Sequence, residues 1–248
     1  MSELFFMLLI VSLLPYIFIP ILIRKKQVFP VRPRVRSISS EFLPKHVLKH
    51  FNKIENEVLA CGLKAKGYFF TQEFGEDIKV FMDFFVDESL RSTSLATCII
   101  ANDSQEILRN FFEINSYEKL GVEISTHNSS LGSAPIQDNS KIVYSFPPQS
   151  KLKKLLFFHG AVVKEKGLKV KNFALPFAND EASFISDSIA RDLKRQESLG
   201  CLMLDENKEQ FRPTWAGAFI MAWYSMWPMK HLRSYWVKIR AKKLFLRS

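Results

Sequence analysis

Two polar residues, Asp83 and His127, have sequence neighbours that could make them reactive or suited to binding a ligand. Asp83 lies between Phe81 and Phe85, and apolar neighbours raise the pKa of a carboxyl group by removing its water. His127 lies in a polar segment, residues 126–129, at the end of an expected strand beside a loop, where binding residues often occur. Together they would form the polar group of an enzyme acting on a lipid or lipid-linked substrate. The plainer interpretations, which we prefer, are an exposed edge position for Asp83 and an ordinary loop histidine.

No familiar catalytic, cofactor or metal motif accompanies these residues. The chain has nine glycines but neither GxGxxG nor GxxxxGK[ST], and it lacks HExxH, GxSxG and CxxC. Its three cysteines, Cys61, Cys98 and Cys201, are an odd number and widely spaced, which suits free thiols in a reducing compartment. We therefore predict no catalytic set, no cofactor and no metal ligands. A non-catalytic protein is favoured, and an enzyme is left open.

The N-terminus carries an uncharged apolar run, residues 4–23, followed at once by Arg24, Lys25 and Lys26. Twenty residues of helix span about 30 Å, the thickness of a bilayer's hydrocarbon core. Because positive flanks stay in the cytoplasm, the run predicts a single-pass transmembrane signal-anchor with the body on the cytoplasmic side. A cleaved signal peptide is the alternative, but it would want a basic start and small residues at the cut, whereas this start carries Glu3.

The net charge of +10 is divided unevenly along the chain. Residues 1–50 carry +6 and residues 211–248 carry +8, whereas residues 51–210 carry −4. A nucleic-acid-binding protein would be expected to carry its basic patch on the folded body, so nucleic acid is not the expected partner. Basic ends beside apolar segments instead indicate contact with a lipid bilayer whose inner leaflet is anionic.

The last segment, residues 214–248, holds all four tryptophans and no acidic residue. Residues 215–229 are uncharged but too few to cross a bilayer easily, so they form either a buried core helix or a membrane-inserted one. Residues 230–248 are basic and moderately amphipathic, which is typical of a helix in the membrane interface. The predicted interface residues are Arg24, Lys25, Lys26, Trp215, Trp223, Trp227, Lys230, Arg233, Trp236, Lys238, Arg240 and Lys242.

Between the two ends the pattern predicts one α+β domain. Apolar residues at helical spacing, from Val47 to Val58, indicate a helix that begins near Pro44 and ends at Gly62. A mostly antiparallel sheet of five or six strands follows, with strands near residues 66–74, 77–87, 93–101, 111–116, 120–126 and 141–146. The second strand is apolar on both faces, so part of its outer face should also be covered. Helices at residues 150–166 and 180–198 would pack this sheet.

The expected organisation therefore has four parts. Residues 1–23 are the anchor, 24–40 a basic, proline-containing linker with no core of its own, 41–213 the cytoplasmic α+β domain, and 214–248 the apolar and then basic helix at the interface.

A short hairpin precedes that last helix, for which Thr214 is the expected N-cap. Residues 200–217 resemble the wing of winged-helix regulators, where a β-hairpin ends in a threonine before a helix with an early glycine. The helix before it carries Arg191, Lys194 and Arg195, and the resemblance implies that this helix would face DNA. It covers fewer than twenty residues, and acidic residues on the same helix offset the basic ones.

The function expected from these features is a membrane-anchored, cytoplasm-facing, non-catalytic binding or scaffolding protein that recruits a protein partner of unknown identity or a small ligand. An enzyme acting on a lipid or lipid-linked substrate and a membrane-tethered winged-helix-like regulator are the alternatives.

Overall fold

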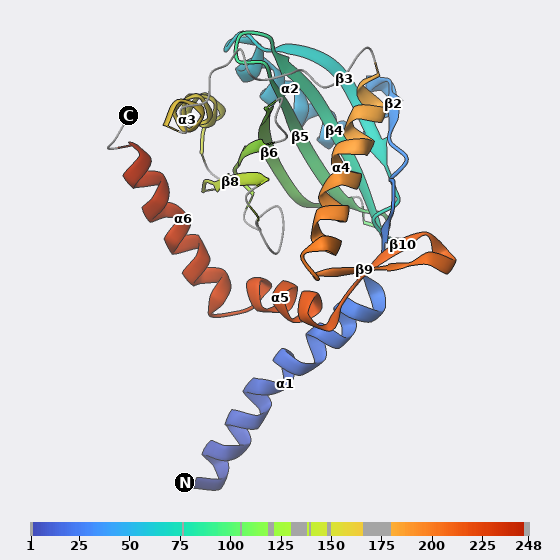
Figure 1. The fold of residues 1–248 in the computed structure, drawn as a ribbon, viewed down its shortest axis with the longest axis vertical. Helices are drawn as coiled ribbons and strands as arrows, with labels where there is room; N and C mark the ends of the chain where they lie inside the picture. The colour runs from blue at the N-terminus through green and yellow to red at the C-terminus, as the bar shows by residue number, and fades with distance from the viewer. Residues whose placement is uncertain are drawn as a thin grey trace.

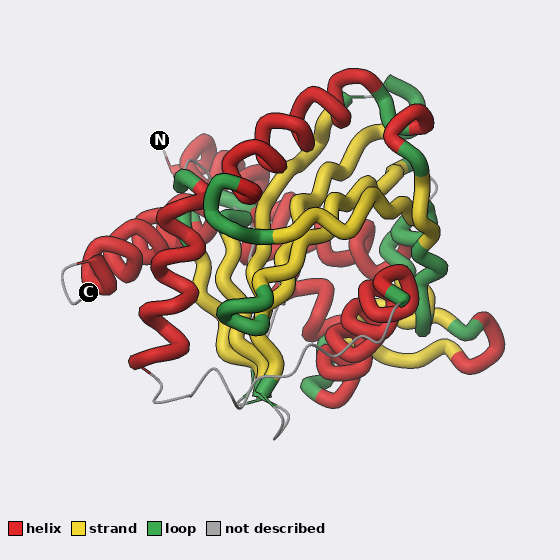
Figure 2. Tube along the Cα trace, turned by 90° about the horizontal axis from the view of Figure 1, so that it is seen from above, coloured by secondary structure: helices red, strands yellow, loops and turns green. Residues whose placement is uncertain are grey.

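A seven-stranded sheet with helices on both of its faces forms the body of the protein (Figures 1 and 2). The structure is a computed structural model, which describes residues 2–75, 77–104, 106–118, 122–129, 138, 140–147, 150–165 and 180–245. Within these ranges the side chains of residues 2–6, 8–13, 240–241 and 244–245 are not described.

The helices are α1 (Ser2–Lys26), α2 (Lys45–Leu59), α3 (Leu152–Glu165), α4 (Glu181–Ser198), α5 (Trp215–Ser225) and α6 (Met229–Phe245). The large sheet contains β2 (Arg36–Ile38), β3 (Lys64–Thr71), β4 (Ile78–Asp87), β5 (Ser92–Ala101), β6 (Ile107–Tyr117), β7 (Glu123–His127) and β8 (Lys141–Ser145). A second sheet is formed by β1 (Phe29–Pro30), β10 (Gln210–Pro213) and β9 (Leu202–Asp205), in that order.

The large sheet is a meander in which each strand pairs with its neighbours in the sequence. All pairs from β2 to β7 are antiparallel, and β8 then adds parallel to β7. The longest pairing joins β4 to β5 without a break, from Ile78–Ala101 to Asp87–Ser92. Antiparallel strands need only a few connecting residues, and residues 88–91 alone connect β4 to β5.

Each face of this sheet has its own apolar core. On one face Phe81 and Phe85 of β4 pack with Phe51 of α2 and Leu155 of α3. On the other face Phe84 and its alternate neighbours pack with Phe184 and Ile185 of α4. The prediction that the second strand is covered on both faces is confirmed, because side chains alternate across a strand and both sets are buried here.

The predicted number of strands is wrong, because the large sheet has seven strands and a second sheet has three. The additional strands β1 and β2 both lie in the segment that was expected to be a linker without a core. The two-residue strand β1 includes Pro30, while Arg36 and Ser37 of β2 are exposed, so neither strand carries the apolar alternation that marks a strand in a sequence.

The prediction of a transmembrane signal-anchor, and with it of a single-pass membrane protein, is also wrong. Over the residues that the structure describes, none of the helices offers the length of apolar surface that a bilayer crossing requires. The described side chains of α1 are Met7 and residues 14–26, which include two prolines and end in three basic residues. Part of α1 also packs on its own chain, where the rings of Tyr16 and Trp223 lie 6.0 Å apart.

Helix α5 is not the buried core helix that was one interpretation of residues 215–229. Its buried residues are the small ones, Gly217, Ala218 and Ala222, whereas Trp215 and Trp223 are exposed. The helix begins as predicted, since the Thr214 hydroxyl accepts a hydrogen bond from the Gly217 amide at 2.9 Å. It ends at Ser225, and α6 begins after Pro228 in a new direction (Figure 1).

Gly217 lies where α5 crosses the start of β9, and this contact generates a prediction. A Cβ atom at Gly217 would overlap the Cys201 carbonyl oxygen and lie 2.7 Å from its carbonyl carbon, so the backbone would have to move. We expect Gly217→Ala to lower the free energy of unfolding by about 1–3 kcal/mol. Gly160→Ala in α3 is the matched control, since nothing lies within 4 Å of that Cβ position. It should raise stability by about 0.5–1 kcal/mol. Urea unfolding of both variants measures these free energies. Equal changes would contradict the close approach of α5 to the Cys201 backbone at Gly217.

Candidate functional site

The two residues singled out from the sequence lie on opposite faces of the large sheet. Asp83 alternates with Phe81 and Phe85 on β4, so it faces α2 and α3. On β7 the side chain of Thr126 points towards α3, where its hydroxyl contacts His159. His127 is the next residue of the strand, so its side chain points to the opposite face, which α4 covers. Strands β5 and β6 separate them. The structure therefore does not bring Asp83 and His127 into one site.

Asp83 is buried in the centre of the sheet, so the interpretation as an exposed edge residue is wrong. Its side chain is 1% exposed, and it lies opposite Tyr68 on β3. Burial, with a further contribution from the negative charge of Glu55 on α2, raises the pKa of Asp83 to about 8. Burial and the same two carboxylates raise the pKa of Tyr68 to about 12, and the Tyr68 hydroxyl donates to Glu55 at 3.3 Å.

His127 is buried and its hydrogen bonds fix its tautomer. The Ser129 amide donates to Nδ1 at 3.0 Å, so Nδ1 carries no proton and the neutral ring carries it on Nε2. Nε2–H then donates to the Ser145 hydroxyl, 3.0 Å away. Burial lowers the pKa of His127 despite the opposing charge of Glu113, which favours this neutral form. A histidine that activates a serine must accept the hydroxyl proton, so this arrangement orients Ser145 without activating it.

A buried ion cluster adjoins His127 and joins the sheet to α4. The ammonium of Lys141, on β8, lies 2.8 Å from Glu123 on β7 and 2.7 Å from Asp192 on α4. Lys141 and Glu123 are each 5% exposed. Burial alone would lower the pKa of Lys141, but the charges of Glu113, Glu123 and Asp192 outweigh it and raise the pKa.

Arg195 of α4 completes the ion cluster. Its guanidinium lies 2.7 Å from Asp192, 3.7 Å from Glu123 and 3.8 Å from Asp138. The nearby Glu113 on β6 accepts a hydrogen bond from Ser125 at 2.6 Å. Burial opposes ionisation of Glu113, yet Lys141 and the hydrogen bonds keep the pKa of that carboxyl lowered. Four carboxylates thus lie around two cations where α4 packs on the sheet.

A second polar cluster, on the opposite face of β6 and β7, was missed by the sequence analysis. The imidazole of His159, on α3, lies 2.8 Å from the Ser116 hydroxyl through Nε2 and 3.0 Å from the Thr126 hydroxyl through Nδ1. All three residues are fully buried, and burial lowers the pKa of His159 to about 4. The signal was present, because His159 continues the buried stripe of Leu152, Leu155, Leu156, Val162 and Val163 at helical spacing.

These contacts support a structural role for the polar clusters. A serine hydroxyl lies beside a histidine in both, but His127 carries its proton on the wrong nitrogen and the His159 cluster is closed to solvent. Among the described residues, no group of three or more histidine, cysteine or acidic residues is arranged to hold a metal ion. What the clusters do is fix the two helices to neighbouring strands: His159 holds α3 to β6 and β7, and Lys141 holds α4 to β7 and β8.

Of the residues predicted for a membrane interface, those of α1 and α5 lie where the two ends of the chain meet, and those of α6 lie on the helix that leads away from α5 (Figure 1). Arg24 of α1 lies over the Trp215 ring at 4.6 Å, and the Tyr16 hydroxyl donates to the Trp227 carbonyl. Arg233 of α6 lies over the Tyr224 ring at 4.9 Å. The predicted interface residues whose side chains are exposed are Lys25, Lys26, Trp215, Trp223, Trp227, Lys230, Trp236, Lys238 and Lys242. The side chain of Arg240 lies outside the described residues.

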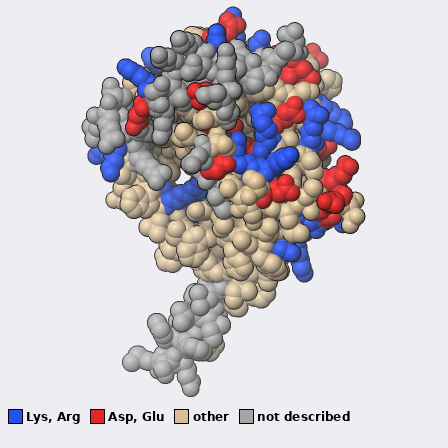
Figure 3. Space-filling view, in the orientation of Figure 1, with Lys and Arg blue, Asp and Glu red and all other residues tan. Residues whose placement is uncertain are grey.

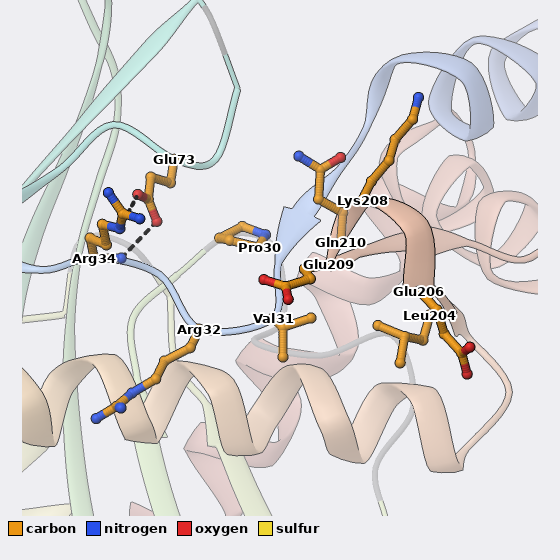
Figure 4. A pocket seen from close by; sticks show the side chains of 10 residues that line it. All are labelled: Pro30, Val31, Arg32, Arg34, Glu73, Leu204, Glu206, Lys208, Glu209 and Gln210. Carbon is orange, nitrogen blue, oxygen red and sulfur yellow. Dashed lines mark hydrogen bonds and ion pairs between the residues drawn. The ribbon is translucent and has the colours of Figure 1, made fainter.

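Two clefts flank the β9–β10 hairpin. The larger, of about 840 Å³, lies between the hairpin and the segment after β1 (Figure 4). Its two arginines point away from the hairpin and are already paired, Arg32 with Asp187 at 2.8 Å and Arg34 with Glu73 at 3.8 Å (Figure 4). The smaller cleft, of about 590 Å³, lies between the hairpin and the end of α1 and includes Arg24 and Lys25.

The predicted hairpin is present, but its surroundings differ from those of the wing of a DNA-binding unit. Strand β10 pairs with β1 on its other side, so the hairpin belongs to a three-stranded sheet. On α4, Arg195 is held by three carboxylates and Arg191 lies over the Tyr117 ring at 5.7 Å. Both arginines are thus engaged within the protein.

No protein family, curated protein or solved structure matches this chain. The assignment of a function therefore rests on the sequence and the geometry described above.

The Lys141 cluster generates a prediction about stability. Lys141→Met leaves the buried Glu123 with only the more distant Arg195, at 3.7 Å, as its cation, so we expect the free energy of unfolding to fall by about 3–5 kcal/mol. Lys64→Met is the control, because Lys64 pairs with Glu88 at the same distance of 2.7 Å on the surface. Its loss should be below about 1 kcal/mol. Chemical denaturation measures both, and equal losses would show that the cluster contributes no more than a surface pair.

Asp83 generates a prediction about pH. Its folded pKa of about 8 lies above the ordinary value of 3.8, so its contribution to stability is complete below pH 4 and is lost as the pH rises towards 8. Asp83→Asn removes that dependence, so the free energy of unfolding of the variant should increasingly exceed that of the wild type as the pH rises from 4 to 8. The gain is on the order of 4 kcal/mol at pH 7, at about 1.4 kcal/mol for each pKa unit. Denaturation at several pH values tests this, with Asp103→Asn in an exposed turn as control. A constant difference between Asp83→Asn and wild type would refute the raised pKa.

Proposed function

We propose that this protein is a non-catalytic binding module that lies on an anionic lipid surface through α1, α5 and α6 and presents its sheet-and-helix body to a protein partner. The proposal involves contact with the surface of a bilayer and no crossing of it. The observation that carries it is the concentration of exposed apolar side chains, flanked by basic ones, on the helices of the two chain ends.

Nineteen large apolar side chains are exposed among the described residues, and twelve belong to α1, α5, α6 or the turn between the last two. They include Ile17 and Phe18 of α1, Trp223 of α5, and Tyr235 and Trp236 of α6. On the face shown in Figure 3, the surface over α5 and the adjoining part of α1 is almost free of charged side chains, which instead gather over the body. An apolar patch of this kind favours an interaction site.

The residue types favour a lipid surface as the partner of this patch. Tryptophan and tyrosine prefer the boundary between headgroups and acyl chains. Lys25 and Lys26 at the end of α1, with Lys230, Lys238 and Lys242 on α6, are exposed on the same helices as the apolar side chains. Lysine near an anionic surface contributes about 1 kcal/mol to binding. The body, which is mildly acidic, would be turned away from such a surface.

The alternatives receive less support from the described residues. An enzyme built on Asp83 and His127 would need the two in one site, and they face opposite sides of the sheet. A DNA-binding helix would need free basic side chains, and Arg195 is bound to three carboxylates. Placement of the body on the cytoplasmic side of the lipid surface is part of the proposal, and it is supported by the three cysteines, which are all free.

Binding to vesicles tests the proposed function. The full chain should sediment with phosphatidylcholine vesicles that contain phosphatidylglycerol and should be released as salt rises, because surface charges are then screened. Replacing Trp227 and Trp236 together by serine should weaken binding by about tenfold or more, since two aromatic side chains no longer enter the interface.

The control for this experiment is Phe42→Ser. Phe42 is 76% exposed and Trp227 is 72% exposed, but Phe42 lies beside α2, on the body. This variant should bind vesicles like the wild type. Vesicles of phosphatidylcholine alone serve as the neutral comparison. The proposal fails if the wild type binds neither these nor the anionic vesicles, or if it binds both equally.

A further inference from the structure

We propose that the smaller cleft, between the end of α1 and the β9–β10 hairpin, binds the phosphate of an anionic glycerophospholipid, whose acyl chains lie along the exposed faces of α1 and α5. This inference rests on the proposed function and adds to it a defined headgroup site. Arg24 and Lys25 are the residues that contact the phosphate oxygens.

The cleft combines the two surfaces that such a lipid requires. Its volume of about 590 Å³ lies within the range of small-molecule sites. Ile21 and Trp215 form an apolar side, while Arg24, Lys25 and Arg212 supply positive charge. Figure 1 shows why these residues meet, since the end of α1 lies beside the hairpin and the start of α5.

The charges of the cleft are unequally engaged. Arg212 lies 3.3 Å from Asp205, so this pair is internally balanced. Arg24 is held over the Trp215 ring at 4.6 Å, and no described carboxylate pairs with it or with Lys25. A guanidinium fixed by an aromatic ring and a neighbouring ammonium suit a phosphate, because charge-assisted hydrogen bonds to its oxygens are strong. Glu206, exposed at the rim, is the one remaining negative charge among the lining residues.

The larger cleft is the weaker candidate although it has more room. Its arginines are paired with Asp187 and Glu73, so an anion would have to compete with existing ion pairs. Its lining also includes no residue of α1, because it lies between the hairpin and the segment after β1 (Figure 4).

A lipid fits the smaller cleft better than a free phosphate ion because its apolar side continues outwards. Trp215 is exposed, and so are Leu22 and Phe18 on α1 and Phe219 on α5. Acyl chains that leave a phosphate at Arg24 and Lys25 would cover these side chains and remove their apolar area from water. A free anion would leave them exposed.

Adjacent lysines provide the test, because Lys25 lines the cleft and Lys26 does not. Both are exposed residues in the last turn of α1, and reversing either charge weakens the general attraction to an anionic surface equally. We expect Lys25→Glu to bind phosphatidylglycerol vesicles about tenfold more weakly than Lys26→Glu at the same salt concentration, because it also loses a charge-assisted hydrogen bond. Lys25→Arg should bind like the wild type.

The outcomes separate the headgroup site from the proposed function. If the wild type binds anionic vesicles and the two reversed variants bind equally, the site is overturned and surface binding stands. If the wild type binds no anionic vesicles, the proposed function fails, and the site fails with it. Glycerol phosphate in solution is the last probe: displacement of the protein at concentrations similar to those of the lipid would assign the cleft to a free anion. Weak competition supports a site that needs the acyl chains.

Discussion

The rest of the body depends on the unbroken pairing of β4 with β5 at the centre of a sheet that is covered on both faces. Antiparallel sheets commonly leave one face in water, and their strands then alternate between apolar and polar residues. Here Phe81 and Phe85 are buried against α2 and α3 while Phe84 is buried against α4, so β4 has no solvent side. The two cores consequently share one backbone layer, and any polar side chain in these central strands must be satisfied inside the protein or must remain neutral.

The strands on the β8 side of the sheet meet that requirement in two different ways. Towards α4, the ionised Lys141 and Arg195 pair with carboxylates that outnumber them, and burial together with the charges of Asp192 and Glu113 raises the pKa of Glu123. Towards α3, His159 is neutral and exchanges hydrogen bonds with hydroxyls. A buried ion pair contributes little net stability, but a buried charge without its partner is strongly destabilising. The Lys141 cluster therefore mainly disfavours packings of α4 on the sheet in which these charges are unpaired. Asp83 on β4 meets the requirement by remaining neutral: its Oδ2 has no hydrogen-bond partner among the described residues, and burial, with the charge of Glu55, raises its pKa to about 8.

The sequence predicted those elements whose residues are repeated at a regular spacing. Helix α2 has its four buried residues where the spacing placed them, and the hairpin and Thr214 cap before α5 were found from local residue types. Strands β1 and β2 were missed because two or three residues cannot display a period. Asp83 was misplaced because alternation does not reveal whether a strand is central or at an edge. The transmembrane prediction failed for a related reason, since a count of apolar residues does not show what they contact. The burial of His159 was predictable, because it lies in the apolar stripe of α3 at helical spacing.

Contacts between distant segments bring the two ends of the chain together. The small residues Gly217, Ala218 and Ala222 let α5 approach its neighbours closely, which turns Trp215 and Trp223 outwards beside α1. The two basic segments are separated by almost the whole sequence, yet α1 precedes β1 and α5 follows β10, and these two strands pair. The small sheet thus fixes both helices at one end of the body. Residues of both termini are therefore held together by the β1–β10 pairing and by the direct contacts of α1 with α5, where Arg24 lies over the Trp215 ring.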